Sequence, residues 1–109
     1  MDRLDEFTTI VQREVADYNN VRDWKAKGYY LENTQERVYT IVIVPDPDHP
    51  DWPTPSIMIM ARVINDKVII DEDTTDRPLY EQLVNCGIPR EQIVLAYAGE
   101  KPQISTENV

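Results

Sequence analysis

Apolar residues near the start of the chain recur at intervals of three and four positions. This spacing is typical of an amphipathic helix, in which such residues share one stripe. The stripe consists of Leu4, Phe7, Val11, Val15 and Tyr18. Asp2 is a suitable N-terminal cap because its carboxylate can accept hydrogen bonds from the first turn. We therefore predict a helix that runs to about Tyr18.

The middle of the chain changes to a pattern rich in β-branched and aromatic residues, which is typical of strands. It predicts four strands, over residues 27–33, 37–44, 56–64 and 67–71. The first two are joined by the short polar segment 33–36. The last two are joined by Asn65 and Asp66, residue types that tolerate the positive φ of a two-residue loop. Both pairs are therefore expected to be antiparallel hairpins.

The C-terminal part returns to a helical pattern over residues 76–86. Pro78 falls in the first turn, where its missing N–H is harmless, and Gly87 suits a left-handed stop. Residues 93–98 then predict a last strand, and a polar tail over about residues 99–109 is expected to be mobile. The expected fold class is two-layer α+β: an antiparallel sheet of four to five strands with an N-terminal helix and a second helix near the C-terminus, all in one domain over residues 1–109.

The second and third strands are apolar on both sides, whereas two helices can cover only one face of such a sheet. Strict alternation places Met58, Met60 and Ile64 on one side of the third strand, and Ile57, Ile59 and Val63 on the other. One hypothesis is that a homodimer or a different partner covers the second face, with Met58 and Met60 in the contact. The alternative is that long loops bury both faces within one chain.

A proline-rich loop over residues 45–55 separates these two strands. Its five prolines remove ladder donors and fix φ, so we expect an exposed, semi-rigid segment. Trp52 lies in this loop and is a candidate anchor for a protein partner, because large aromatic residues dominate protein interfaces. Packing of Trp52 back onto the sheet edge is the alternative.

The charge balance argues against direct, stand-alone DNA binding. The 109 residues include 11 Lys and Arg against 20 Asp and Glu, a formal net charge of −9, and the densest cationic run is only Arg22, Lys25 and Lys27. A surface this negative repels the phosphate backbone, so a basic protein is the natural complement. The lone Cys86 allows no internal disulfide, and the longest apolar runs are far shorter than a membrane span, so we expect a cytoplasmic protein.

Candidate chemistry is sparse, and each candidate has a structural alternative. His49 among Asp46, Asp48 and Asp51 could hold a cation, but a solvated turn explains the same residues. The acidic group formed by Asp71, Glu72, Asp73 and Asp76 could act as acid and base or bind Mg²⁺, but a hairpin end and a helix start favour the same residues. Cys86 has no base near it in sequence. We therefore predict no catalytic residue, no metal site and no cofactor, with Asp71 and Asp73 as candidate partner contacts.

Two segments resemble the XisI family, the fdxN element excision controlling factor proteins of cyanobacteria. They are residues 63–70, with the sequence VINDKVII, and residues 79–95, with the sequence LYEQLVNCGIPREQIVL. The most specific part is residues 83–95, where a helix, a glycine stop, Ile-Pro and an Ile-Val-Leu strand follow in order. The end of the first helix and the start of the second strand at residues 37–39 are also similar, whereas the loop at residues 45–55 looks like an insertion.

The resemblance implies a small α+β fold and a role in controlling the excision of a DNA element during heterocyst differentiation, together with a companion protein, XisH. It transfers no catalytic residue. The favoured hypothesis is thus an accessory protein that binds a XisH-like partner, and is itself a homodimer. The alternative is a DNA-contacting excision cofactor that uses Arg22, Lys25 and Lys27, and a third possibility is a metal-dependent hydrolase built on the acidic group at residues 71–76.

Overall fold

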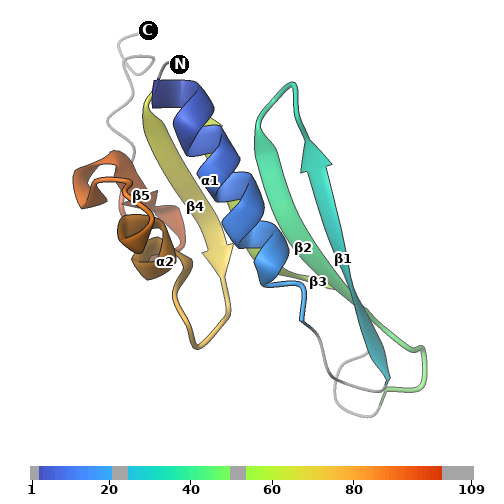
Figure 1. Ribbon diagram of the computed structural model, residues 1–109. Helices are drawn as coiled ribbons and strands as arrows, with labels where there is room; N and C mark the ends of the chain where they lie inside the picture. The colour runs from blue at the N-terminus through green and yellow to red at the C-terminus, as the bar shows by residue number, and fades with distance from the viewer. Residues whose placement is uncertain (1–2, 21–24, 50–53, 102–109) are drawn as a thin grey trace, which may run out of the picture.

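The chain forms one five-stranded sheet with both helices on the same side of it (Figure 1). This computed structural model describes residues 3–20, 25–49 and 54–101. In chain order the helices and strands are α1 (Arg3–Asp17), β1 (Ala26–Asn33), β2 (Val38–Pro45), β3 (Ser56–Ile64), β4 (Lys67–Asp73), α2 (Leu79–Asn85) and β5 (Ile93–Leu95), with 3₁₀ turns at Arg90–Gln92 and Ala96–Ala98. Within the described residues, no helix is long and apolar enough to cross a membrane.

The sheet order follows the chain, β1-β2-β3-β4-β5. The first four strands form an antiparallel meander, and β5 pairs parallel to β4 because α2 carries the chain back across the sheet. The predicted α+β class, with an N-terminal helix and a second helix near the C-terminus, is confirmed. The parallel last strand is the one departure from a purely antiparallel sheet, and it stops at Leu95, three residues earlier than predicted.

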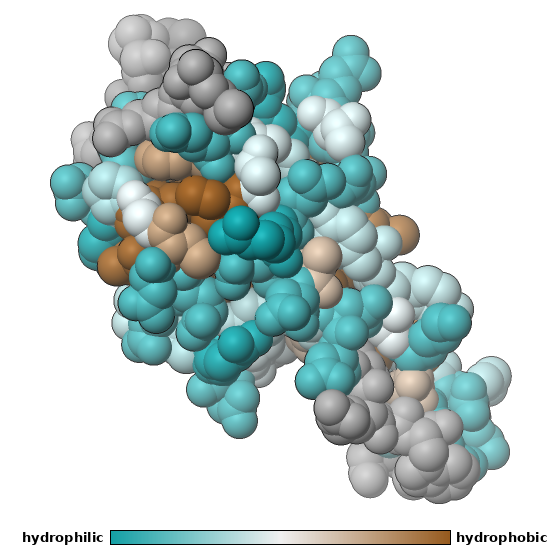
Figure 2. Space-filling model, viewed as in Figure 1, coloured by the Kyte–Doolittle hydropathy of each residue, from teal (hydrophilic) through white to brown (hydrophobic). Residues whose placement is uncertain are grey.

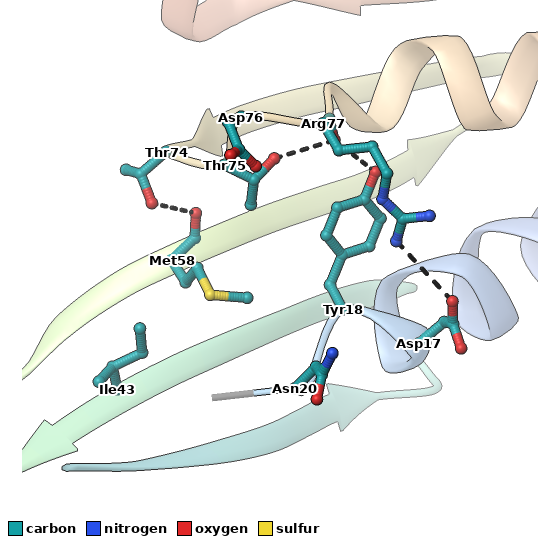
Figure 3. A pocket seen from close by; sticks show the side chains of 9 residues that line it. All are labelled: Asp17, Tyr18, Asn20, Ile43, Met58, Thr74, Thr75, Asp76 and Arg77. Carbon is teal, nitrogen blue, oxygen red and sulfur yellow. Dashed lines mark hydrogen bonds and ion pairs between the residues drawn. The ribbon is translucent and has the colours of Figure 1, made fainter. Parts of the chain in front are cut away.

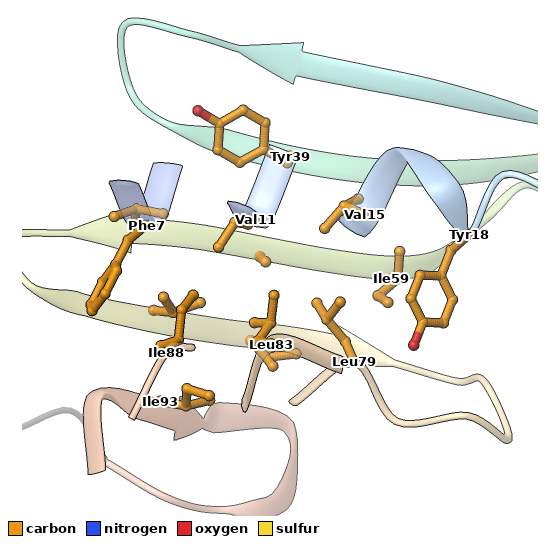
Figure 4. Packing of buried hydrophobic residues seen from close by; sticks show 14 of the residues in the cluster. Phe7, Val11, Val15, Tyr18, Tyr39, Ile59, Leu79, Leu83, Ile88 and Ile93 are labelled. Atoms are coloured by element: carbon orange, nitrogen blue, oxygen red, sulfur yellow. The ribbon is translucent and has the colours of Figure 1, made fainter. Parts of the chain in front are cut away.

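The core lies between the helices and one face of the sheet (Figure 4). The predicted stripe of α1 supplies Phe7, Val11, Val15 and Tyr18, all 6% exposed or less, and α2 adds Leu79 and Leu83. They pack on Tyr39, Ile41, Ile59, Ala61, Val63, Val68 and Ile70 from the three central strands. Burial of this apolar surface is the main stabilising term, at about 25 cal/mol per Å².

Two turns have the geometry that their sequences predicted. Asn65, at φ 56°, links β3 to β4 in a two-residue hairpin with Asp66. Gly87, at φ 108°, ends α2, and the Ile88 N–H donates to the Leu83 carbonyl at 3.1 Å. That six-to-one bond, with Leu83 and Ile88 both buried, is a Schellman stop.

Two β-bulges interrupt the central strands, between Ile41 and Val42 in the β2–β3 pair and between Met60 and Ala61 in the β3–β4 pair. Ile41 pairs with Ile59, and Val42 pairs with Ile57, so Met58 is the extra residue of the first bulge. A bulge places two residues opposite one and breaks the alternation of faces. The expectation that Met58 shares a face with Met60 is therefore wrong, since Met58 packs against the core on the helix side.

Candidate interaction surface

The face of the sheet that points away from the helices has no covering layer among the described elements. Pairing and alternation place these residues on it: Lys27, Tyr29, Leu31 and Asn33 of β1; Val38, Thr40, Val42 and Val44 of β2; Ile57, Met60, Arg62 and Ile64 of β3; Lys67, Ile69, Asp71 and Glu72 of β4; and Val94 of β5. We call this set the open face. It is the feature that two-sided apolar strands predicted.

Large hydrophobic side chains gather on the open face. Of the six such side chains that are exposed in the described part of the chain, four belong to it: Tyr29 at 44%, Leu31 at 51%, Val44 at 38% and Ile57 at 42%. The other two, Val84 and Tyr97, lie in α2 and in the turn after β5. Scattered exposed hydrophobics are normal, but a gathered set on one flat surface is typical of a binding site.

The apolar residues of the open face form rows across the strands. Tyr29 of β1 pairs with Val42 of β2, which pairs in turn with Ile57 of β3. The next row joins Leu31, Thr40 and Met60. Side chains in cross-strand rows lie close enough to pack on each other, so these rows form a continuous surface.

The charges of the open face are nearly balanced, unlike those of the whole chain. It carries the cations Lys27, Arg62 and Lys67 and the anions Asp71 and Glu72. Arg62 makes two hydrogen bonds to Asp71, at 2.7 and 3.0 Å, in a partly buried pair. Both carboxylates of the open face, Asp71 and Glu72, are half-buried.

The exposed carboxylates lie elsewhere on the molecule. Figure 2 shows the helix side, which is mostly hydrophilic, with one apolar area to the left. The exposed acidic residues outside the open face, in the part of the chain that is described, are Asp5, Glu6, Asp17, Glu32, Glu36, Asp46, Asp48, Asp66, Asp76, Glu81, Glu91 and Glu100. The exposed cations there are Arg13, Arg77, Arg90 and Lys101. The helix side and the turns therefore carry the acidity of the chain.

Asp71 and Asp73, predicted as one acidic group, lie on opposite sides of the sheet. The Asp73 carboxylate accepts hydrogen bonds from the Thr75 N–H at 3.0 Å, from the Thr75 hydroxyl at 2.6 Å and from the Leu79 N–H at 2.8 Å. It thereby satisfies a free N–H of the first turn of α2, which a helix start needs. Asp71 instead pairs with Arg62 on the open face. The capping explanation thus accounts for Asp73.

A cavity of about 530 Å³ on the helix side lies where α1 ends against the turn before α2 (Figure 3). Tyr18 donates from its hydroxyl to the Arg77 carbonyl at 2.6 Å, and the Arg77 guanidinium lies 4.4 Å from the Tyr18 ring centre. Burial raises the pKa of Tyr18 to about 12. Met58 lines this cavity with Ile43, far from Met60 on the other face. These contacts close the end of the core.

The N-terminal helix is also tied to the edge strand by a polar cluster. Glu32 accepts hydrogen bonds from the Tyr30 hydroxyl at 2.6 Å and from the Gln12 amide at 2.8 Å. The Tyr30 bond, and then the Gln12 bond, hold the pKa of Glu32 below its usual range. Burial raises the pKa of Tyr30. The cluster ties α1, which packs on the central strands, to the neighbouring edge strand β1.

Two residues of the predicted basic run, Lys25 and Lys27, lie in the described part of the chain. Lys25 pairs with Asp48 at 2.9 Å, and Lys27 lies on the open face with its amine 5.3 Å from the Tyr29 ring centre. Arg22 lies outside the described residues, as do Asp51 and Trp52. His49, Asp46 and Asp48 are described, and no group of three or more His, Cys, Asp or Glu side chains in the described ranges is placed to hold a metal ion.

Cys86 lies at the end of α2, partly buried, with its sulfur accepting a 3.5 Å hydrogen bond from Arg13. The contact joins the two helices on their outer side.

Sequence reasoning did not identify Tyr29 and Leu31 as surface residues. The pattern that could have identified them is the alternation of side chains along an edge strand, which places Tyr29 and Leu31 on the face opposite to Tyr30.

The comparisons with known proteins agree on one family. A protein-family model described as "XisI protein" matches residues 1–108. A XisI-like protein from Anabaena variabilis ATCC 29413 has a crystal structure that superposes with a TM-score of 0.75 at 24% identity, over 84% of each chain. The fdxN element excision controlling factor XisI of the same organism superposes with a TM-score of 0.72 at 20% identity, over 88% of this chain and 87% of that one. No curated protein matches the chain in sequence.

Proposed function

The chain belongs to the XisI family, and on that basis we propose that it is a regulatory protein without chemistry of its own. In this proposal it controls the excision of a DNA element by binding a XisH-like protein. The observation that carries the proposal is the match of the family over residues 1–108, together with a fold shared with an excision controlling factor. The expectation that the chain is not an enzyme is part of the same proposal.

The charge distribution supports a cationic partner. A protein that handles DNA must present positive charge to the phosphate backbone. The exposed carboxylates of the helix side and the turns are complementary to such a surface. Bound there, the acidic protein would compete with DNA for the partner's cationic channel, and this competition is the proposed mechanism of control.

The predicted contact residues differ in how well they fit a cationic partner. Asp73 is used internally at the start of α2, and Met58 is packed on the core side. Asp71 and Met60 lie on the open face, where the charge is balanced. We therefore assign the cationic partner to the acidic helix side and the turns, and Trp52 stays a predicted contact outside the described residues.

The test is co-purification of the tagged chain with the product of its neighbouring gene. We expect a stoichiometric complex whose affinity falls as salt rises, since exposed charges are screened. DNA added to the complex should compete with the chain. Absence of a complex at low ionic strength would contradict the function, whereas a complex insensitive to salt and to DNA would contradict only the electrostatic mechanism.

A second candidate is a DNA-contacting excision cofactor, and the observation that favours it among the described residues is the exposure of Lys27. Its test is a gel-shift series at low ionic strength with the Lys25→Ala and Lys27→Ala variants. A shift that these changes abolish would support this candidate over the first.

A further inference from the structure

We infer that the open face is the interface of a homodimer, in which two copies of the chain pack sheet to sheet around a two-fold axis. The inference is independent of the proposed function, because the dimer uses the open face and the proposed partner uses the acidic remainder of the surface. It rests on three observations: where the exposed apolar side chains lie, how charge is distributed, and how large the face is.

The apolar side chains are arranged as a sheet interface requires. The row Tyr29, Val42 and Ile57 crosses three neighbouring strands without a charged residue, and both of its ends are more than two fifths exposed. Two sheets pack with such side chains interdigitated between them, about 10 Å apart. A two-fold axis near this row would place each copy's row against the other's.

The charge distribution favours a second copy as the occupant. A chain of net charge −9 is repelled by its own copy over most of its surface. The open face is the exception, since three cations and two anions lie on it and its strongest pair, Arg62 with Asp71, is already matched within the chain. Two open faces can therefore meet without an excess of like charge, whereas a cationic protein is better matched by the carboxylates elsewhere.

The area is of the right order for a stable dimer. Strands β1 to β4 have seven to nine residues each. At about 3.3 Å per residue and about 4.8 Å between strands, they present a flat area of roughly 500 Å². The accessible area exceeds the flat area because the side chains roughen the surface, and a standard interface buries about 800 Å² on each partner.

The experiment is sedimentation velocity of the full chain across the micromolar range, with the variants Ile57→Lys and Val84→Lys. Val84→Lys is the matched control for Ile57→Lys. Both side chains are aliphatic, Ile57 is 42% exposed and Val84 is 40% exposed, and of the two only Ile57 lies on the open face. We expect the unchanged chain and Val84→Lys to sediment as dimers and Ile57→Lys as a monomer. Lysine makes the chain less negative, so dissociation by Ile57→Lys could not come from added net charge.

Circular dichroism of each variant checks that it is folded, and Leu31→Lys provides a second variant at the most exposed large hydrophobic side chain of the face, at 51%. It too should give a folded monomer. A chain that stays monomeric throughout the concentration range overturns the inference. A dimer that survives both Ile57→Lys and Leu31→Lys also overturns the inference, because the contact would then lie elsewhere. The same holds if the chain is a monomer by itself and its open face is covered only when a different protein binds.

Discussion

Arg62 and Asp71 join β3 to β4 through two parallel hydrogen bonds, from Nε to Oδ2 at 2.7 Å and from Nη2 to Oδ1 at 3.0 Å. The pair lies on the open face, with the two side chains 35% and 27% exposed. A bidentate ion pair fixes the orientation of both side chains as well as neutralising their charges. It therefore holds Arg62 and Asp71 in one arrangement on this face.

Loss of that pair should lower stability modestly. Because the pair is partly solvated, Asp71→Asn is expected to reduce the free energy of unfolding by about 1 kcal/mol. Urea denaturation at one fixed protein concentration measures the effect, since dimerisation would couple stability to concentration. Asp76→Asn, at an exposed carboxylate, is the control and should change little. Equal effects of the two changes would argue against the pair.

The start of α2 should depend on Asp73. Asp73→Ala removes the acceptor of the Leu79 N–H and both bonds to Thr75, so the first turn loses its partner. The expected loss is about 1 to 2 kcal/mol, in the range of helix capping residues. Thermal unfolding and hydrogen exchange of the α2 amides both report it. Unchanged exchange at Leu79 would show that this carboxylate does not hold the helix start.

The end of α2 should depend on Gly87 through its backbone alone. An added Cβ would meet nothing within 4 Å, but φ is +108°. Gly87→Ala is therefore expected to lower the free energy of unfolding by about 1 to 2 kcal/mol from conformational strain. Asn85→Ala, at an exposed site in the same helix, is the matched control in a chemical denaturation series. A neutral Gly87→Ala would mean that the turn relaxes.

Stability should fall at alkaline pH through Tyr18. Burial raises its pKa to about 12, whereas an unfolded tyrosine titrates near pH 10. The contribution of the neutral hydroxyl is thus fully present below about pH 10 and is lost as pH rises toward 12. Tyr18→Phe should be about 1 kcal/mol less stable at neutral pH, because the bond to Arg77 is gone, and should show a shallower alkaline decline. Parallel declines would contradict the assignment.

The sequence predicted the elements well because each has a strong local cause. The stripe from Phe7 to Tyr18 has the helical period, and Gly87 is the residue type that a left-handed stop requires. The α+β class followed from the order of these elements. The open face followed in the same way, from strands that are apolar on both sides while the helices cover one.

The site was predicted less completely because its details depend on tertiary structure. Alternation placed Met58 with Met60, but a bulge depends on how two strands pair and leaves no mark in one strand alone. Asp73 caps a helix that begins six residues later, a reach that no local capping pattern contains. The acidic group therefore appeared continuous in sequence, although its members face opposite sides of the sheet.

The fifth strand closes an edge of the sheet that the rest of the chain leaves open. Residues Ile93–Leu95 pair with β4 at Val68, Ile69 and Ile70. Without these three residues, β4 would become an edge strand whose free N–H and C=O groups can recruit strands from other chains. A chain truncated just before Ile93 should therefore be aggregation-prone, whereas a chain that extends beyond Leu95 keeps this edge paired.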